Sequence, residues 1–187
     1  FLASEKRRNY QLTKIEILKN GKPNTKGQIF KNTHKGRDRR NYKRWTTPRR
    51  SEIVAELKKL EMLPAIYFIF SRKGCDEARD SMIRYVGALN NKDEGKKARN
   101  YAEEKFQLLT VEEKSILRVD SLLEGLEKGF ASHHAGMLPV FKQTIEELFS
   151  LGLIKLVFAT ETLAVGVNLP AKSVVVEKLT KFNGEGH

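Results

Sequence analysis

Residues 154–171 read IKLVFATETLAVGVNLPA, and this stretch indicates the fold class of the chain. Its first six residues, 154–159, form an apolar run typical of a buried parallel strand. Small, polar or flexible residues follow directly: Thr160, Glu161, Thr162, Gly166 and Asn168. Ligands of open α/β sheets bind beyond the carboxyl ends of the strands, where such residues would lie. On composition alone, an ordinary strand and turn explains the stretch as well as a ligand site does.

Strand and helix patterns alternate along the rest of the chain. Apolar or alternating runs predict further strands at 10–18, 65–70, 130–132 and 173–176. One-sided apolar patterns with start or stop residues predict helices at 48–62, 73–89, 112–128 and 139–151. The polar segments 24–47 and 90–100 are interpreted as loops. This alternation predicts an α/β fold with a mostly parallel sheet flanked by helices.

The net charge of +12 is concentrated at one end of the chain. Residues 1–50 contain 16 Lys and Arg against 3 Asp and Glu, a net charge of +13, whereas residues 51–187 contain 19 against 20, a net charge of −1. We therefore divide the chain into a basic N-terminal arm or insertion, 1–50, and a body, 51–187. Such an arm attracts a polyanion, and its Tyr42 and Trp45 can stack on bases. The alternative is a solvated segment without a specific partner.

The single cysteine, Cys75, excludes a disulfide within the chain and fits a reducing compartment. Its place just after a predicted strand favours a structural thiol over a nucleophile. No apolar run approaches the roughly 20 residues that a membrane-spanning helix needs, so we expect no membrane partner.

Three stretches, in this order, resemble motifs of the superfamily 2 helicases in the form used by the Ski-type DExH group. PAIYFIFSRKGC at 64–75 is similar to motif IV, and ASHHAGMLP at 131–139 is similar to the HHxGxLP element. FATETLAVGVNLPA at 158–171 is similar to motif V. The residues around 66–75 look closest to the cyanobacterial and plant-chloroplast DEVH-box RNA helicases. The resemblance covers residues 62–187 and implies a second RecA-like domain.

The resemblance also implies roles for individual residues. Nucleic-acid contacts are implied for Ser71, Arg72, His133, His134, Gly136, Thr160, Glu161 and Thr162. Gly166 and Asn168 would face the ATP cleft, and no residue of this chain would be catalytic. For Arg72 the alternative is that it and Lys73 form an ordinary solvated basic pair.

The pair His133-His134 suggests a metal site, but adjacent side chains on an extended segment point in opposite directions. The other two histidines lie far away in the sequence, and no cysteine is nearby to complete a zinc site. We therefore expect no metal and favour phosphate contact or a structural role in the turn.

Several parts of an ATPase are missing from the sequence. It contains no GxxxxGK[ST] loop, and the arginine-rich motif VI of the resembling helicases, which follows motif V, is not in it. Asp76-Glu77 looks like part of a DExD box, but five residues separate it from the strand before it. We interpret these carboxylates as residues of a first helical turn that favour the helix dipole.

These observations predict the nucleic-acid-gripping half of an ATP-dependent RNA helicase. ATP and Mg²⁺ would act in the full-length enzyme, where the first RecA-like domain of the same polypeptide would be the partner of this one. The fragment alone would be inactive and would bind neither ATP nor Mg²⁺ tightly. We expect RNA as the nucleic acid, although backbone contacts leave DNA open. The alternative is a stand-alone RNA-binding module without ATPase. The expected compartment is the bacterial cytoplasm or the chloroplast.

Overall fold

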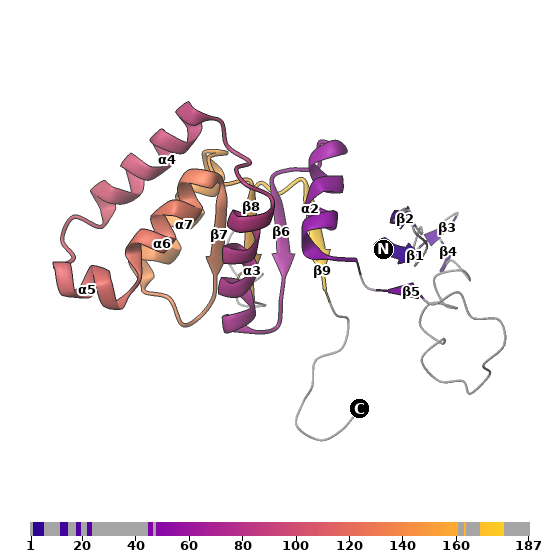
Figure 1. Cartoon of the computed structure of the whole chain (residues 1–187), viewed down its shortest axis with the longest axis horizontal. Coiled ribbons are helices and arrows are strands. Elements are labelled where there is room, and N and C mark those ends of the chain that lie inside the picture. The colour runs from indigo at the N-terminus through magenta and orange to yellow at the C-terminus, as the bar shows by residue number, and fades with distance from the viewer. Residues whose placement is uncertain are drawn as a thin grey trace, which may run out of the picture. The chain divides into compact units, whose positions relative to one another are not determined.

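The computed structural model describes residues 48–160, Leu163 and 169–177 fully, and five short strands before residue 48 by their backbone only. The chain divides into two compact units, Phe1–Val54 and Ala55–His187, and each is described by itself (Figure 1). In the described part of the chain, no helix is both long and apolar enough to cross a membrane.

The first unit contains short antiparallel strands. β1 (Leu2–Glu5) lies between β2 (Leu12–Lys14) and β5 (Trp45–Thr46), and β3 (Leu18–Lys19) pairs with β4 (Lys22–Pro23). β2 covers the centre of the strand predicted at 10–18, and β3 begins at its last residue. β5 lies inside the segment predicted as a loop.

Helix α2 (Arg50–Lys59) ends the first unit and begins the second. It stops short of the predicted Met62 because Glu61 adopts a left-handed conformation with φ of 55°. The amide of Met62 then donates to the carbonyl of Leu57 at 2.9 Å, a bond typical of helix C-termini.

The second unit is built on a sheet of four parallel strands in the order β7-β8-β6-β9. The strands are β6 (Ala65–Phe68), β7 (Phe130–His133), β8 (Leu156–Ala159) and β9 (Ser173–Val176). β7 and β8 are buried along their whole length, as expected for strands covered on both faces. The predicted α/β fold with a RecA-like domain is confirmed.

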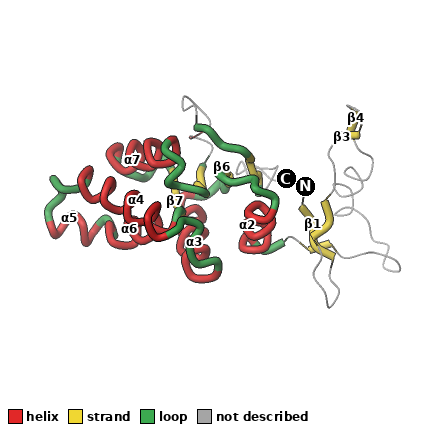
Figure 2. The backbone as a smooth tube through the Cα atoms, turned by 90° about the horizontal axis from the view of Figure 1, so that it is seen from above, coloured by secondary structure: helices red, strands yellow, loops and turns green. Residues whose placement is uncertain are grey.

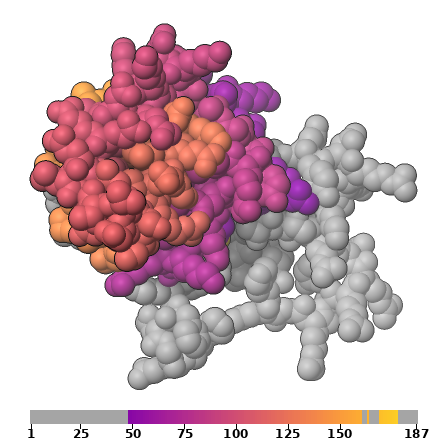
Figure 3. Space-filling model, turned by 60° about the vertical axis from the view of Figure 1, so that its left-hand side comes forward, coloured from indigo at the N-terminus to yellow at the C-terminus, as the bar shows by residue number. Residues whose placement is uncertain are grey.

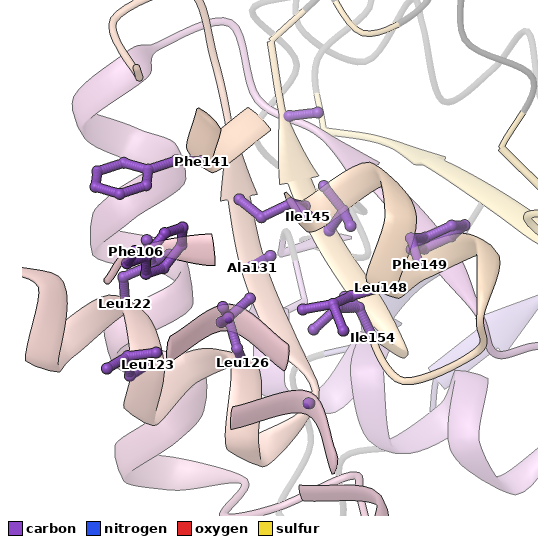
Figure 4. Packing of buried hydrophobic residues seen from close by; sticks show 14 of the residues in the cluster. Phe106, Leu122, Leu123, Leu126, Ala131, Phe141, Ile145, Leu148, Phe149 and Ile154 are labelled. Carbon is purple, nitrogen blue, oxygen red and sulfur yellow. The ribbon is translucent and has the colours of Figure 1, made fainter. Parts of the chain in front are cut away.

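Helices cover both faces of this sheet. Figure 2 shows α3 (Arg72–Tyr85) and α7 (Pro139–Ser150) on opposite sides of β7. On the α3 side, the rings of Tyr67 and Phe158 pack with their centroids 5.4 Å apart. On the α7 side lies the main apolar cluster, whose central side chains are shown in Figure 4. Its labelled members are Phe106, Leu122, Leu123, Leu126, Ala131, Phe141, Ile145, Leu148, Phe149 and Ile154.

Two helical predictions need correction. Of the segment 90–100, predicted as a loop, residues 92–100 belong to helix α4 (Lys92–Lys105). The helix begins with a capping box, in which Asn91 Oδ1 accepts from the Glu94 amide at 2.9 Å and Glu94 Oε2 accepts from the Asn91 amide at 3.0 Å. Its buried face consists of the small residues Gly95, Ala98 and Ala102, which is why no apolar period marked it.

The helix predicted at 112–128 is two helices, α5 (Val111–Ile116) and α6 (Val119–Lys128). Arg118, with φ of 54°, interrupts the helical backbone between them. The predicted stop at Gly129 is confirmed, with φ of 85°. Residues of α4 to α7 form the face of the unit that comes forward in Figure 3.

Candidate nucleic-acid interface

The carboxyl edge of the parallel sheet brings together the three motifs found in the sequence. β6 leads into Ser71 and Arg72, β7 into the histidine pair, and β8 into Thr160. The strands are in register at this edge, because Phe68 and His133 both lie opposite Ala159. The amide of Thr160 donates to the carbonyl of His133 at 3.2 Å, so the ends of two motifs are joined directly.

The two histidines point to opposite faces of the sheet, as the sequence predicted. His133 Nε2 lies 2.7 Å from Glu146 Oε1 on α7, and His134 Nε2 lies 3.1 Å from Asp76 Oδ2 on α3. Both residues are more than nine-tenths buried. Among the described residues, no group of three His, Cys, Asp or Glu side chains could hold a metal ion. As placed, both rings support the turn from inside, and their contact with nucleic acid stays a prediction.

The backbone selects the tautomer of the neutral His134 ring. The amide of Gly136 donates to His134 Nδ1 at 3.2 Å, and an amide can only donate. When the ring is neutral, its proton is therefore on Nε2, which donates to the carboxylate of Asp76. The turn at 134–136 is thus closed by a hydrogen bond to the His134 ring, and that ring is hydrogen-bonded to Asp76 on α3.

Asp76 has a different role from the one predicted. Helix α3 begins at Arg72 and carries no acidic residue in its first turn, so the interpretation of Asp76 as a dipole-favouring cap was wrong. Its Oδ1 accepts from Ser132 Oγ at 2.6 Å, and its Oδ2 accepts from His134. Burial acts to raise the pKa of Asp76, but the hydrogen bonds from His134 and Ser132 and the charge of Arg79 outweigh burial and lower it. The carboxyl group is therefore ionised at neutral pH.

His133 pairs with a carboxylate on the other face of the sheet. Burial lowers the pKa of His133 and outweighs the opposing effect of its hydrogen bond to Glu146, so the ring is neutral at neutral pH. Nε2–H then donates to Glu146, while Nδ1 is buried and has no hydrogen-bond partner among the described residues. The ring is therefore held from the α7 side, through Glu146.

Arg72 and Gly136 lie side by side although they come from different motifs. A Cβ atom placed on Gly136 would lie 3.5 Å from Arg72 Cδ and 3.3 Å from His134 Nδ1. A Cβ here would therefore touch both side chains, with the His134 ring having to shift by only a few tenths of an ångström. Ser71 caps α3, its Oγ accepting from the Gly74 amide at 3.1 Å, while Arg72 is exposed and the described residues offer its guanidinium no hydrogen bond or ion pair.

Comparison with known proteins agrees with this arrangement, although no profile of a known family matches the chain. Over 140 residues, 75% of the chain, it is 46% identical to the probable helicase HelY of Mycobacterium tuberculosis. It is 43% identical over 143 residues, 76% of the chain, to the chloroplastic DExH-box ATP-dependent RNA helicase DExH15 of Arabidopsis thaliana. It is 39% identical over 135 residues, 72% of the chain, to the antiviral helicase SKI2 of Saccharomyces cerevisiae. The chain belongs to the Ski2-type DExH-box helicases.

The chain corresponds to only a part of these helicases. Its matched region spans 16% of HelY, 12% of DExH15 and 10% of SKI2. Its parallel sheet and flanking helices are those of one RecA-like helicase domain.

Some predicted site residues of this helicase domain lie outside the described residues. They are Glu161, Thr162, Gly166, Asn168 and Tyr42, and of Trp45 only the backbone is described, in β5. The contribution of these residues to RNA or ATP binding therefore stays a prediction.

Sequence reasoning missed the partners of the histidines. Asp76 is 58 residues from His134, and Glu146 is 13 residues from His133. One local signal was available: Ser132 and His133 are polar residues inside an otherwise buried strand, and buried polar groups require partners.

Proposed function

We propose that this chain is the second RecA-like domain of an ATP-dependent RNA helicase, and that the carboxyl edge of its sheet grips the RNA backbone. The observation that carries the proposal is the convergence of Arg72, Gly136 and Thr160, from three separate motifs, at that edge. The relative DExH15 is named an ATP-dependent RNA helicase, which supports both RNA and ATP.

The chemistry of this edge suits a phosphate chain. Arg72 is the first residue of the 14-residue helix α3, so its positive charge lies at the positive end of the helix dipole. A guanidinium binds phosphate through two parallel hydrogen bonds. Backbone contacts of this kind hold a strand without reading its sequence.

DNA remains the second candidate because HelY is named a helicase with no nucleic acid specified. Contacts to phosphate do not distinguish the two sugars, and a contact to the 2′-OH is needed to do so. The stand-alone RNA-binding module without ATPase is the third candidate. A P-loop and a DExH box in the preceding part of the gene would exclude it.

ATP and Mg²⁺ belong to the complete enzyme in this proposal. The first RecA-like domain of the same polypeptide would provide the phosphate loop, and Gly166 and Asn168 of this chain would form the opposite wall. The organisms of the relatives support a bacterial cytoplasm or a chloroplast as the compartment.

The test compares Arg72→Ala with Lys73→Ala in the complete enzyme. Both variants lose one exposed positive charge, but Lys73 already pairs with Glu77 at 3.6 Å. We expect Arg72→Ala to weaken binding of single-stranded RNA about tenfold and to flatten the log–log salt dependence by about 0.7. Lys73→Ala should change binding much less, and neither should change ATP affinity.

Equal effects of the two variants would show that only net charge matters and would contradict the grip at Arg72. A DNA strand of the same sequence, bound as tightly as the RNA and unwound as fast, would favour the DNA candidate.

A further inference from the structure

A polar network lies between α3, α6 and β7, beneath the turn at 134–136. At its centre is the buried guanidinium of Arg79, which donates to Asp80 at 2.8 and 3.0 Å and to Ser132 Oγ at 3.2 Å. Arg79 Nη2 also lies 3.3 Å from Ser121 Oγ on α6. The network continues through Asp76 to His134 and ends at the amide of Gly136.

Asp76 is the acceptor that this network needs at His134. Because the Gly136 amide occupies Nδ1, the ring must donate from Nε2, and only an acceptor can face it there. Asp76 provides that acceptor with Oδ2 and receives the Ser132 hydroxyl with Oδ1. Each of these contacts then has one donor and one acceptor.

We infer that Asp76 is a positioning residue that holds His134, and through it the Gly136 amide, beside Arg72. This inference rests on the proposed function, because the turn matters only if it contacts RNA. Asp76 and Arg72 lie on the same helix, α3. The helix thus carries both the cation proposed to meet phosphate and the carboxylate that places the neighbouring turn.

Neutralising Arg79 is not the main task of Asp76. Asp80 already accepts two hydrogen bonds from that guanidinium, whereas the nearest approach of Asp76 is 3.7 Å. The side chain of Asp76 is also 42% exposed, so water screens its ion pairing. Loss of Asp76 should therefore leave the domain folded while it releases His134.

Charge and positioning predict opposite effects of removing Asp76. A carboxylate near an RNA path repels phosphate, so a purely electrostatic role predicts that Asp76→Ala strengthens RNA binding. Positioning predicts that it weakens the contact at Gly136 and Arg72. Asp76→Asn separates the two roles, since the amide oxygen can accept from His134 and the amide nitrogen can donate to Ser132.

The experiment follows NMR signals of the 187-residue chain. Without RNA, we expect the Gly136 amide to exchange about threefold to tenfold faster in Asp76→Ala than in wild type. Asp76→Asn should behave like wild type. So should Glu77→Ala, which removes the neighbouring, exposed carboxylate of the same helix.

RNA is then added as a short single-stranded oligouridylate. Shifts of the Gly136 amide and the Arg72 Nε signal should appear in wild type, Asp76→Asn and Glu77→Ala, and should fall about threefold or more in Asp76→Ala. Unchanged Gly136 exchange in Asp76→Ala, or larger shifts in that variant, would overturn the inference. If exchange changes as expected but RNA shifts neither signal in wild type, the positioning role stands and the proposed RNA grip fails.

Discussion

Thr160 is proposed to contact phosphate, and its backbone is held in place by the end of a buried strand. It follows the buried strand β8, its amide donates to His133, and its carbonyl accepts from Leu163 at 3.2 Å. These two bonds fix the backbone of Thr160 and with it the direction of the Cα–Cβ bond. A hydroxyl carried on an ordered backbone has less entropy to lose when it donates to a phosphate.

We predict that Thr160→Ala in the complete enzyme weakens RNA affinity by roughly 1.5–3 kcal/mol, the usual contribution of a hydrogen bond to a charged group. RNA stimulation of ATP turnover should fall with it, while ATP affinity and folding stay near normal. Binding titrations and steady-state ATPase assays measure both effects. Thr144→Ala is the control, because the Thr144 hydroxyl is bonded within α7 to the Val140 carbonyl. Wild-type RNA affinity in Thr160→Ala would remove Thr160 from the interface.

His133 makes stability depend on pH in a defined window. Its folded pKa lies below the ordinary value of 6.5, so the unfolded chain binds the proton more readily. The stabilisation is therefore complete above pH 6.5 and is lost as the pH falls toward the folded pKa. The carboxyl groups with lowered pKa, Asp76, Glu94 and Glu147, act only below their ordinary values of 3.8 to 4.5.

We predict that the free energy of unfolding of wild type falls between pH 7.5 and pH 5.5. His133→Gln, whose amide can still donate to Glu146, should show a smaller fall, because glutamine has no titratable group in place of the imidazole of His133. Urea unfolding at both pH values measures the difference. An equally steep fall in the variant would assign the pH dependence to other groups.

At the scale of elements, strand ends were predictable from the sequence and helix packing was not. Apolar runs predict β6 and β8 directly, because a parallel strand inside a sheet is buried on both faces. An apolar run also predicts β9, although this strand lies at the end of the four-stranded order and its side chains are half-buried or exposed. Helix α4 was missed since its buried face is made of glycine and alanine, although Asn91 and Glu94 form a capping box that a local reading could have found. The break at Arg118 has no local sequence signal, because a left-handed arginine is stabilised only by the packing around it.

The candidate site also has a part that the sequence predicts and a part that only the packing of the elements decides. The resemblance implied nucleic-acid contacts for Ser71, His133 and Thr160, and the structure places all three at the carboxyl edge of one sheet. The carboxylates that hold the histidines could not be predicted, since a partner 58 residues away is chosen by the packing of α3 on β7.

The contact of α4 with α6 permits a prediction in which two effects have opposite signs. Helix propensity alone predicts that Gly95→Ala stabilises by about 1 kcal/mol. A Cβ at this position, however, would lie 2.7 Å from the Glu127 backbone carbonyl oxygen, which cannot move without shifting α6. We expect net destabilisation of about 1–3 kcal/mol, as in other overpacked cores.

Urea unfolding of Gly95→Ala and Asn100→Ala tests this expectation. Asn100 is exposed on the same helix, so its replacement should stabilise by a few tenths of a kcal/mol through propensity alone. If Gly95→Ala is also more stable than wild type, the helices are not in contact at that position.

At the scale of the whole molecule, the sequence lacks the residues that phosphoryl transfer needs, although it has the motifs implied to bind nucleic acid. It contains no P-loop, and neither of its two Asp-Glu pairs follows directly on a strand. Asp76-Glu77 lies on α3, where Asp76 is engaged by His134 and Ser132, and Asp93-Glu94 lies in the first turn of α4, where Glu94 belongs to the capping box. We predict that the purified chain hydrolyses no ATP, with or without RNA. Phosphoryl transfer is catalysed almost entirely by positioning the phosphates and the metal ion, and the chain lacks the phosphate loop that does so. Release of phosphate that RNA stimulates and that persists through repeated purification would contradict the prediction.

The uneven charge of the molecule predicts where its non-specific affinity comes from. The arm carries +13 and the body −1, so counterion release should come mostly from residues 1–50. Seven Lys and Arg lie between residues 31 and 44. Replacing all seven by Gln should flatten the log–log salt dependence of single-stranded RNA binding by up to about 5, since each phosphate contact contributes about 0.7.

The matched control removes seven positive charges from the body, at Lys58, Lys59, Arg84, Lys92, Lys96, Lys97 and Lys114. Net charge falls equally in both variants, so a difference between them reports contact and not long-range attraction. We expect the body variant to keep nearly the wild-type slope, measured by fluorescence anisotropy from low to moderate salt. If both variants lose the same slope, RNA is attracted by total charge, and the arm is not the binding element. If only the body variant loses it, the main electrostatic contact lies on the RecA-like domain itself.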